Sequence, residues 1–460
     1  MLLPPLASEF DPAESDETSI DPLGLATTYE RLADQMLGNV TVRMSRIRLV
    51  TAIGVGAVVA EAWGDGEVAN DGVSAPDMIF EWLTIMAFVR HGRGEVQDHL
   101  RGVGGMQKVE RSLRAGSPVS AKTYLKTPRV FGFGGVFRRF AEGSGVLDRD
   151  GRLEDAGRSL VLAWERDQGL SGFLDGTPGS KGGEFLEALR KTVGTGMSKG
   201  FVAASHVPSK LSEQMFAHLN PDGLMDRHLR NGNEQRVLRD LVRSGAASTN
   251  RRGRPDQREC SEFLFDCIKT HGRQLSQPEE ADFLRARSST APIALREVLD
   301  EIDAYESLCR PLRDTIDWIR WSMGTRATPL ERTDFVHATQ SAGYLAALHT
   351  GVLRVQSTER LYTQHPDVKT LLERFGEVRS AGDLFDAVID HHHIVQREKP
   401  PSGKRPWVDP VGKSGRYLVR PSYVLDEAPP VRPHTAPAPY VHEYRIRTLT
   451  RFLRDLGEIE

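Results

Sequence analysis

One apolar periodicity constrains the fold of this chain more than any other feature. Between residues 295 and 323, apolar side chains recur at alternating spacings of three and four, namely Leu295, Val298, Ile302, Tyr305, Cys309, Leu312, Ile316, Ile319 and Met323. This spacing places them along one side of an α-helix and predicts packing against another helix. Because Pro311 lacks an amide hydrogen, the run is either two helices that meet at Arg310-Pro311 or one kinked helix. A core helix is favoured over an intermolecular coiled coil, since the run is short and interrupted.

Length and composition indicate a soluble protein with several cores. The chain has 460 residues, of which 39% are hydrophobic and 27% are charged, with a net charge of −3. Its helical periodicities predict a mainly α, multidomain fold. The predicted segments are an acidic arm (1–20), an N-terminal helical domain (21–116), a helix–hairpin–helix module (117–176), a helical region with an Arg-rich loop (184–290), a long helix and bundle (291–375) and a basic α/β element (376–460). Few cysteines and no run of about 18 apolar residues favour a cytoplasmic protein without a membrane span.

The C-terminal part carries a local excess of positive charge. Between Ile394 and Pro421 the basic residues are Arg397, Lys399, Lys404, Arg405, Lys413, Arg416 and Arg420, and the acidic ones are Glu398 and Asp409. Trp407 and Tyr417 are interleaved with these charges. Cationic side chains can contact phosphates, and aromatic rings can stack on bases or sugars. The pattern predicts contact with a polyanion, and a solvated charged surface is the alternative.

Residues 118–176 are similar to the end of a winged-helix module. A predicted helix at 131–142 is followed by Gly145-Val146-Leu147-Asp148-Arg149-Asp150-Gly151-Arg152-Leu153, which is typical of a tight hairpin, and by a helix from Glu154. The resemblance implies that DNA is approached by the helices and the wing. The residues implicated are Lys122, Lys126, Arg129, Arg138 and Arg139 on the helical part, and Arg149 and Arg152 on the wing. The alternatives are a helical domain without a ligand and a protein–protein adaptor.

A second basic island lies in residues 225–258. Within it, Arg252-Gly253-Arg254-Pro255 resembles the core of an AT-hook, which lies in the minor groove of A·T-rich DNA. Asp256 departs from the basic residue that such hooks prefer. The resemblance makes Arg251, Arg252 and Arg254 candidate nucleic-acid contacts. The favoured alternative is an Arg/Gly loop tip.

A metal site is conceivable near the triplet His391-His392-His393. On a helix, Asp386, Asp390 and His393 share one polar face, since residues three or four apart are neighbours. Three such ligands could hold a divalent ion for a nuclease, whereas the favoured interpretation is a solvated face. His392 points toward the apolar side and is expected in the core. No phosphate loop and no nucleophile motif is found, and we expect no bound cofactor.

Three arginines near the N-terminus have two interpretations. Arg43, Arg46 and Arg48 precede the apolar run of a predicted helix at 45–62. They either face a ligand or form a solvated helix start, and the solvated start is favoured.

The N-terminal stretch also resembles uncharacterised bacterial proteins of phage-defence or mobile-element loci. The resemblance is carried by Asp21-Pro22-Leu23-Gly24-Leu25, Leu32-Ala33-Asp34, Val40-Thr41-Val42-Arg43 and Arg46-Ile47-Arg48. Together these observations predict a component of a bacterial multi-protein system that binds nucleic acid, with DNA as the expected polymer and other protein subunits as partners. A metal-dependent nuclease and a structural adaptor that binds no nucleic acid are the alternatives, and an enzymatic role is not favoured.

Overall fold

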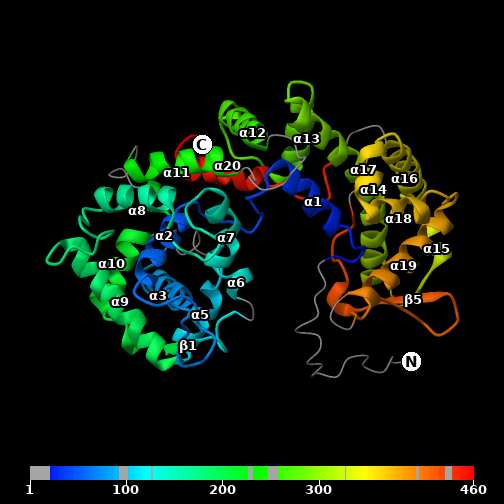
Figure 1. Ribbon diagram of the computed structural model, residues 1–460. Coiled ribbons are helices and arrows are strands. Elements are labelled where there is room, and N and C mark those ends of the chain that lie inside the picture. Colours follow the sequence, from blue (N-terminus) through cyan, green and yellow to red (C-terminus); the bar gives the residue numbers. More distant parts are fainter. Residues whose placement is uncertain are drawn as a thin grey trace. The chain divides into compact units, whose positions relative to one another are not determined.

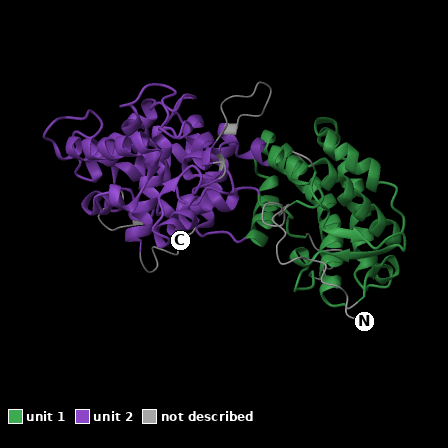
Figure 2. Cartoon of the chain, turned by 90° about the horizontal axis from the view of Figure 1, so that it is seen from below, with its two compact units in different colours: residues 1–32, 277–443 green, residues 33–276, 444–460 purple. Residues whose placement is uncertain are grey.

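The computed structural model is mainly helical, as predicted (Figure 1). It describes residues 21–92, 102–125, 128–225, 232–246, 257–326, 328–399, 403–429 and 438–460. The chain forms two compact units, unit 1 from residues 1–32 and 277–443 and unit 2 from residues 33–276 and 444–460 (Figure 2). The predicted segments 21–116, 184–290 and 376–460 therefore each contribute residues to both units.

Unit 2 is a helical assembly with one short antiparallel ribbon. Its helices are α2 (Leu49–Ala60), α3 (Pro76–His91), α5 (Met106–Arg114), α6 (Pro128–Phe131), α7 (Phe133–Gly143), α8 (Asp155–Asp167), α9 (Lys181–Lys199), α10 (Ser209–Leu219), α11 (Asn233–Gly245), α12 (Gln257–His271) and α20 (Ile446–Asp455). The short helices η1 (Ala204–His206) and η2 (Gly223–Met225) flank α10. Strand β1 (Val119–Ser120) pairs antiparallel with β2 (Phe201–Val202).

Two apolar helices form the centre of unit 2. Nearly every side chain of α2 is buried, and α3 is buried from Ile79 to Phe88. Helix α3 packs against α2, α5, α7, α9 and α10. A helix that is apolar on all sides must be surrounded by other elements, and this explains why α2 and α3 lie inside.

Helix α20 returns to unit 2 from the far end of the sequence. Its side chains Ile446, Leu449, Phe452 and Leu453 are at most 1% exposed, and so is Leu456 directly after it. The ring of Phe452 stacks on Phe137 of α7 at a centroid distance of 6.1 Å. Unit 2 therefore needs this helix to close its core.

The predicted helix–hairpin–helix order is present in unit 2. Helix α7 leads into a tight turn closed by one antiparallel bridge between Leu147 and Leu153, and α8 follows. Asp148 Oδ1 accepts hydrogen bonds from the N–H groups of Asp150 and Arg152, at 2.9 and 2.8 Å. These contacts define a helix, a turn and a helix, and the resemblance to a winged-helix module stays a prediction.

Unit 1 is built around the long helix that the periodicity predicts. Its helices are α13 (Gln277–Ser288), α14 (Ile293–Gly324), α15 (Arg332–Val336), α16 (Ser341–Gln356), α17 (Glu359–Gln364), α18 (Pro366–Phe375), α19 (Ala381–Glu398) and η3 (Pro421–Tyr423). Strands β3 (Leu330–Glu331), β5 (Arg416–Val419) and β4 (Val408–Pro410) form an antiparallel sheet in the order β3-β5-β4. Helix α1 (Ala26–Met36) begins in unit 1 and ends in unit 2.

Helix α14 runs through Pro311 without a break. The predicted seam from Leu295 to Ile319 is buried within unit 1, mainly against α16, which confirms a core helix. Pro311 leaves the Ser307 carbonyl without its usual helical donor, because proline lacks an N–H group. This carbonyl faces Gly351 of α16, where an added Cβ would lie only 2.5 Å from its oxygen. The close approach of α16 is thus possible only at a residue without a side chain.

The C-terminal element of unit 1 packs around α19. Ser380 and Asp383 form a capping box at the start of α19, in which Ser380 Oγ accepts a hydrogen bond from the Asp383 N–H at 3.1 Å. Tyr417 of β5 makes an edge contact with Phe385 of α19. In the described part of the chain, no helix combines the length and apolar character that crossing a bilayer requires.

Candidate nucleic-acid interface

A stripe of cations lies along the exposed side of α5. Lys108, Arg111 and Arg114 follow one another at intervals of three residues and are all exposed, whereas Met106, Val109 and Ser112 are buried against the unit. Residues three apart on a helix are neighbours, so these charges form one line. Arg114 pairs with Glu110, the single acidic residue between positions 102 and 141.

An exposed aromatic ring with adjacent cations ends α6. Phe131 is 43% exposed, and the guanidinium carbon of Arg43 lies 4.8 Å from the centroid of its ring. Arg129, on the same short helix, is exposed, and so is Lys122 in the turn after β1. We refer to Arg43, Lys108, Arg111, Arg114, Lys122, Arg129 and Phe131 as the α5–α6 surface.

The buried carboxylate of Glu81 holds the segments that carry this surface. Tyr124 Oη donates a hydrogen bond to Glu81 Oε1 at 2.5 Å, and the Gly134 N–H donates to Glu81 Oε2 at 2.8 Å. These bonds tie the turn after β1 and the first turn of α7 to α3. The loop before α5 packs directly against the Tyr124 hydroxyl. A Cβ atom at Gly105 in this loop would lie only 2.1 Å from Tyr124 Oη. The glycines of this loop therefore permit close packing.

Burial is the main cause of the pKa shifts of Glu81 and Tyr124. It raises the pKa of Glu81 to about 7, although the hydrogen bonds from Tyr124 and Gly134 act in the opposite direction. Burial and the charge of Glu81 raise the pKa of Tyr124 far above its usual value, so Tyr124 stays the donor. Glu81 has no basic partner in these contacts, and its ionised form is therefore less stable inside the fold than it is in water.

The titration of Glu81 should appear in the pH dependence of stability. Its pKa is raised on folding, so the folded state binds a proton between about pH 4.5 and 7 that the unfolded state releases. The free energy of unfolding should therefore fall by about 3 kcal/mol as the pH rises through this window. Glu81→Gln should remove this component. Urea unfolding at pH 5 and pH 8 checks the difference between the two proteins, and a difference that does not change with pH would contradict the raised pKa.

Several of the winged-helix arginines are engaged within the protein. Arg138 pairs with Glu142 and donates to the carbonyl oxygens of Asp148 and Arg149, so it braces the turn. Arg139 contacts both oxygens of Asp34, and Arg152 pairs with Asp65. By contrast, Lys108, Arg111, Lys122 and Arg129 have no ion-pair partner in the described part of the chain. Arg149 is exposed, and Lys126, Arg251, Arg252 and Arg254 lie outside the described residues.

The structure corrects the interpretation of Trp407 as a stacking residue for a ligand. Trp407 is only 3% exposed, and its ring stacks on Tyr423 at a centroid distance of 4.5 Å and an interplanar angle of 7°. The guanidinium of Arg320 lies 4.8 Å from the same ring. The aromatic and cationic partners of Trp407 are thus inside unit 1, and no face remains for a base.

The other cations of the C-terminal loop differ in exposure. Arg397, Lys413 and Arg416 are exposed. Arg405 pairs with Asp409 at 3.8 Å, Lys399 donates to the Asp21 carbonyl, and Lys404 is half-buried. Arg416 of β5 lies opposite Glu331 of β3. This loop therefore presents fewer unpaired cations than its sequence indicates.

The histidine triplet binds three separate parts of unit 1. His392 is fully buried, which confirms its prediction as a core residue, and its two ring nitrogens contact the Pro22 carbonyl and the Trp407 N–H. His391 contacts the Leu23 carbonyl and Arg374. Burial lowers the pKa of both to about 4, so both rings are neutral. His393 Nε2 donates to the Val408 carbonyl at 2.7 Å.

The metal hypothesis gains no support from these contacts. Asp386 pairs with Arg332 at 3.1 Å, and Asp390 is exposed. Within the described residues, no group of three His, Cys, Asp or Glu side chains is placed to hold a metal ion.

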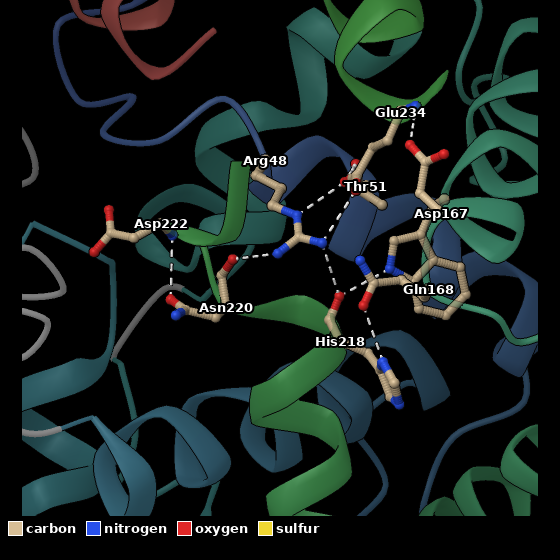
Figure 3. Close-up of polar contacts among 9 residues, drawn as sticks. Arg48, Thr51, Asp167, Gln168, His218, Asn220, Asp222 and Glu234 are labelled. Carbon is tan, nitrogen blue, oxygen red and sulfur yellow. Dashed lines mark hydrogen bonds and ion pairs between the residues drawn. The ribbon is translucent and has the colours of Figure 1, made fainter. Parts of the chain in front are cut away.

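Two arginines that sequence reasoning placed on a solvated helix start are buried instead. Arg48 is 1% exposed and makes two hydrogen bonds to Glu234 of α11, at 2.9 and 3.0 Å (Figure 3). Its guanidinium also donates to the carbonyls of His218 and Asn220 and so caps the C-terminal end of α10. Arg46 pairs with Asp455 of α20 at 2.6 Å and with Asp222 at 3.3 Å. Of the three arginines, Arg43 alone is exposed.

The Arg48 network is structural rather than a ligand site. Every nitrogen of the Arg48 guanidinium has a protein acceptor, and Thr51 donates to Glu234 at 2.8 Å. Asp167 of α8 in turn accepts the Glu234 N–H at 2.8 Å, as Figure 3 shows. The network joins α2, α8, α10 and α11. Comparisons with protein-family models, curated proteins and solved structures give no match.

Proposed function

We propose that this protein binds nucleic acid, with DNA as the expected polymer, through the α5–α6 surface of unit 2. The observation that carries the proposal is the set of exposed cations without ion-pair partners in the described part of the chain, Lys108, Arg111, Lys122 and Arg129. Arginines that pair within the fold have little capacity left for a ligand, whereas these four can neutralise phosphates. The C-terminal cations Arg397, Lys413 and Arg416 form a second, smaller proposed contact.

Removing two charges of the stripe tests the proposal. Lys108→Ala with Arg111→Ala should weaken binding to DNA of any sequence, because phosphate contacts carry no sequence information. The slope of log affinity against log salt should become shallower by roughly 1.4 to 1.8, as expected for two phosphate contacts. Fluorescence anisotropy at several salt concentrations measures both quantities. Unchanged affinity and slope would remove α5 from the interface.

Two further variants serve as matched comparisons. Lys191→Ala with Lys210→Ala removes two exposed cations from α9 and α10 and should leave the salt slope unchanged. Lys413→Ala with Arg416→Ala removes two exposed cations of the C-terminal loop and tests the second proposed contact in the same way. If all three pairs act equally, overall charge explains the binding and no particular surface is responsible.

The alternatives have less support from the described residues. A metal-dependent nuclease would need Asp386, Asp390 and His393 to converge, yet two of these side chains are engaged with Arg332 and Val408. An adaptor that uses the 295–323 seam lacks a free seam, since the seam residues from Leu295 to Ile319 are buried in unit 1. The resemblance of the N-terminal stretch to phage-defence and mobile-element proteins supports a role within a multi-protein assembly. The composition of complexes purified from the source cells tests that role.

A further inference from the structure

We propose that the α5–α6 surface takes single-stranded nucleic acid and that Phe131 is its base-stacking residue. This inference rests on the proposed function, because it specifies which form of nucleic acid the same surface binds. It is based on the exposure of Phe131, on the rigidity of the backbone that carries it and on the cations around it.

The exposure of Phe131 is not explained by the packing of unit 2. Its neighbour Phe133 is 3% exposed and fills the core, whereas Phe131 is 43% exposed. Phe131 is the single aromatic residue among the exposed large hydrophobic side chains of the described chain. One isolated ring is smaller than the contiguous apolar patch that a protein partner normally covers. A single ring does match the face of one base.

The backbone at Phe131 and immediately after it is closely packed. A Cβ at Gly104 would lie 2.2 Å from the Phe131 carbonyl oxygen, so the loop before α5 contacts this peptide directly. The following residue, Gly132, donates to the Pro128 carbonyl at 2.8 Å, and a Cβ there would lie 2.1 Å from Glu81 Oε1. The ring is therefore presented from an ordered backbone, and little conformational entropy is lost when it binds a partner.

The chemistry around the ring favours a nucleobase with its phosphates. The Arg43 guanidinium lies 4.8 Å from the ring centroid, and planar guanidinium and aromatic groups both stack on bases. Arg129 and Lys122 supply exposed positive charge on the adjoining segments. In a duplex the faces of the bases are covered by their neighbours, so a side chain that stacks needs an unpaired strand. The combination of ring and cations thus selects single strands.

Substitutions of Phe131 separate stacking from charge. The probes are an oligothymidylate, a duplex of equal length and a strand of equal length made of abasic sites. Phe131→Ala should weaken binding of the oligothymidylate by roughly 5- to 150-fold, since one stacked base contributes about 1–3 kcal/mol. It should leave binding of the abasic strand unchanged, because that strand keeps its phosphates. Phe131→Trp should retain the affinity, and Phe131→Leu should lose it, because leucine is apolar but has no π-face.

Controls distinguish this inference from the proposed function. Val73→Ala removes another exposed apolar side chain of unit 2, 58% exposed, and should have no effect on binding. Thermal melting checks that each variant is folded. Equal weakening on the oligothymidylate and the abasic strand, or a preference of the wild type for duplex, would overturn the inference. In that case a flatter salt slope of the Lys108→Ala/Arg111→Ala protein would still support nucleic-acid binding, whereas no binding of any probe would end both proposals.

Discussion

Arg48→Met is expected to destabilise unit 2 by roughly 3–5 kcal/mol, because it leaves a carboxylate buried without its cation. The side chains of Arg48 and Glu234 are each 1% exposed, so water cannot replace the lost partner. Two carbonyls at the end of α10 lose their donors at the same time. Urea unfolding of the wild type and the variant measures the difference.

Two comparisons show whether the buried pair is the cause. Adding Glu234→Leu to Arg48→Met should recover part of the loss, since the double change removes the uncompensated charge. Arg158→Met breaks a more exposed pair with Glu61, 3.9 Å apart, and should change stability by less than about 1 kcal/mol. If the two single losses simply add in the double variant, the charges are not coupled.

Removal of residues 444–460 is expected to abolish the cooperative unfolding of unit 2. The truncation removes five large side chains in and just after α20 that are at most 1% exposed, and each such loss typically costs about 2–5 kcal/mol. The sum, roughly 10–25 kcal/mol, is as large as or larger than the roughly 5–15 kcal/mol by which folded domains are stable. The truncation also leaves Arg46 without Asp455 and Asp34 without Arg445. Limited proteolysis and circular dichroism should show unit 2 degraded or partly unfolded.

A peptide supplied separately tests whether α20 acts through its packing. A synthetic peptide of residues 444–460 should restore protection when added to the truncated chain, and the same peptide with Phe452→Asp should not. A truncated chain that unfolds with the cooperativity of the wild type would contradict the predicted role of α20.

The parts of the fold that the sequence predicts are those with local signals. The 295–323 seam lies on one helix, so its periodicity locates α14, and the capping box at Ser380 marks the start of α19. Such signals need only neighbouring residues. The sequence alone leaves the effect of Pro311 open, because it does not show that α16 approaches α14 at Gly351.

The candidate site is harder to predict, because the sequence shows which residues are charged but not which of them form ion pairs inside the fold. Arg48 pairs with Glu234, and Arg46 pairs with Asp455. Both pairs join residues that are far apart in the sequence, and no local pattern links them. Around Trp407, alternation of cations and rings is equally compatible with a ligand site and with the internal stack on Tyr423 and Arg320. One usable signal was missed. Residues 102–141 contain eight basic residues and one acidic residue, an imbalance that leaves cations without partners.

The split composition of unit 2 has a consequence for how the chain is made. The ribosome completes residues 33–276 first, then all of the second stretch of unit 1, and only afterwards the residues of α20. At typical rates of about 5–20 residues per second, the intervening stretch takes roughly 10–30 s to translate. Throughout that interval the nascent chain exposes the apolar site of α20 around Phe137 and Phe140. All segments of unit 1 have been translated once residue 443 is added, so unit 1 can finish folding before unit 2, which still lacks residues 444–460.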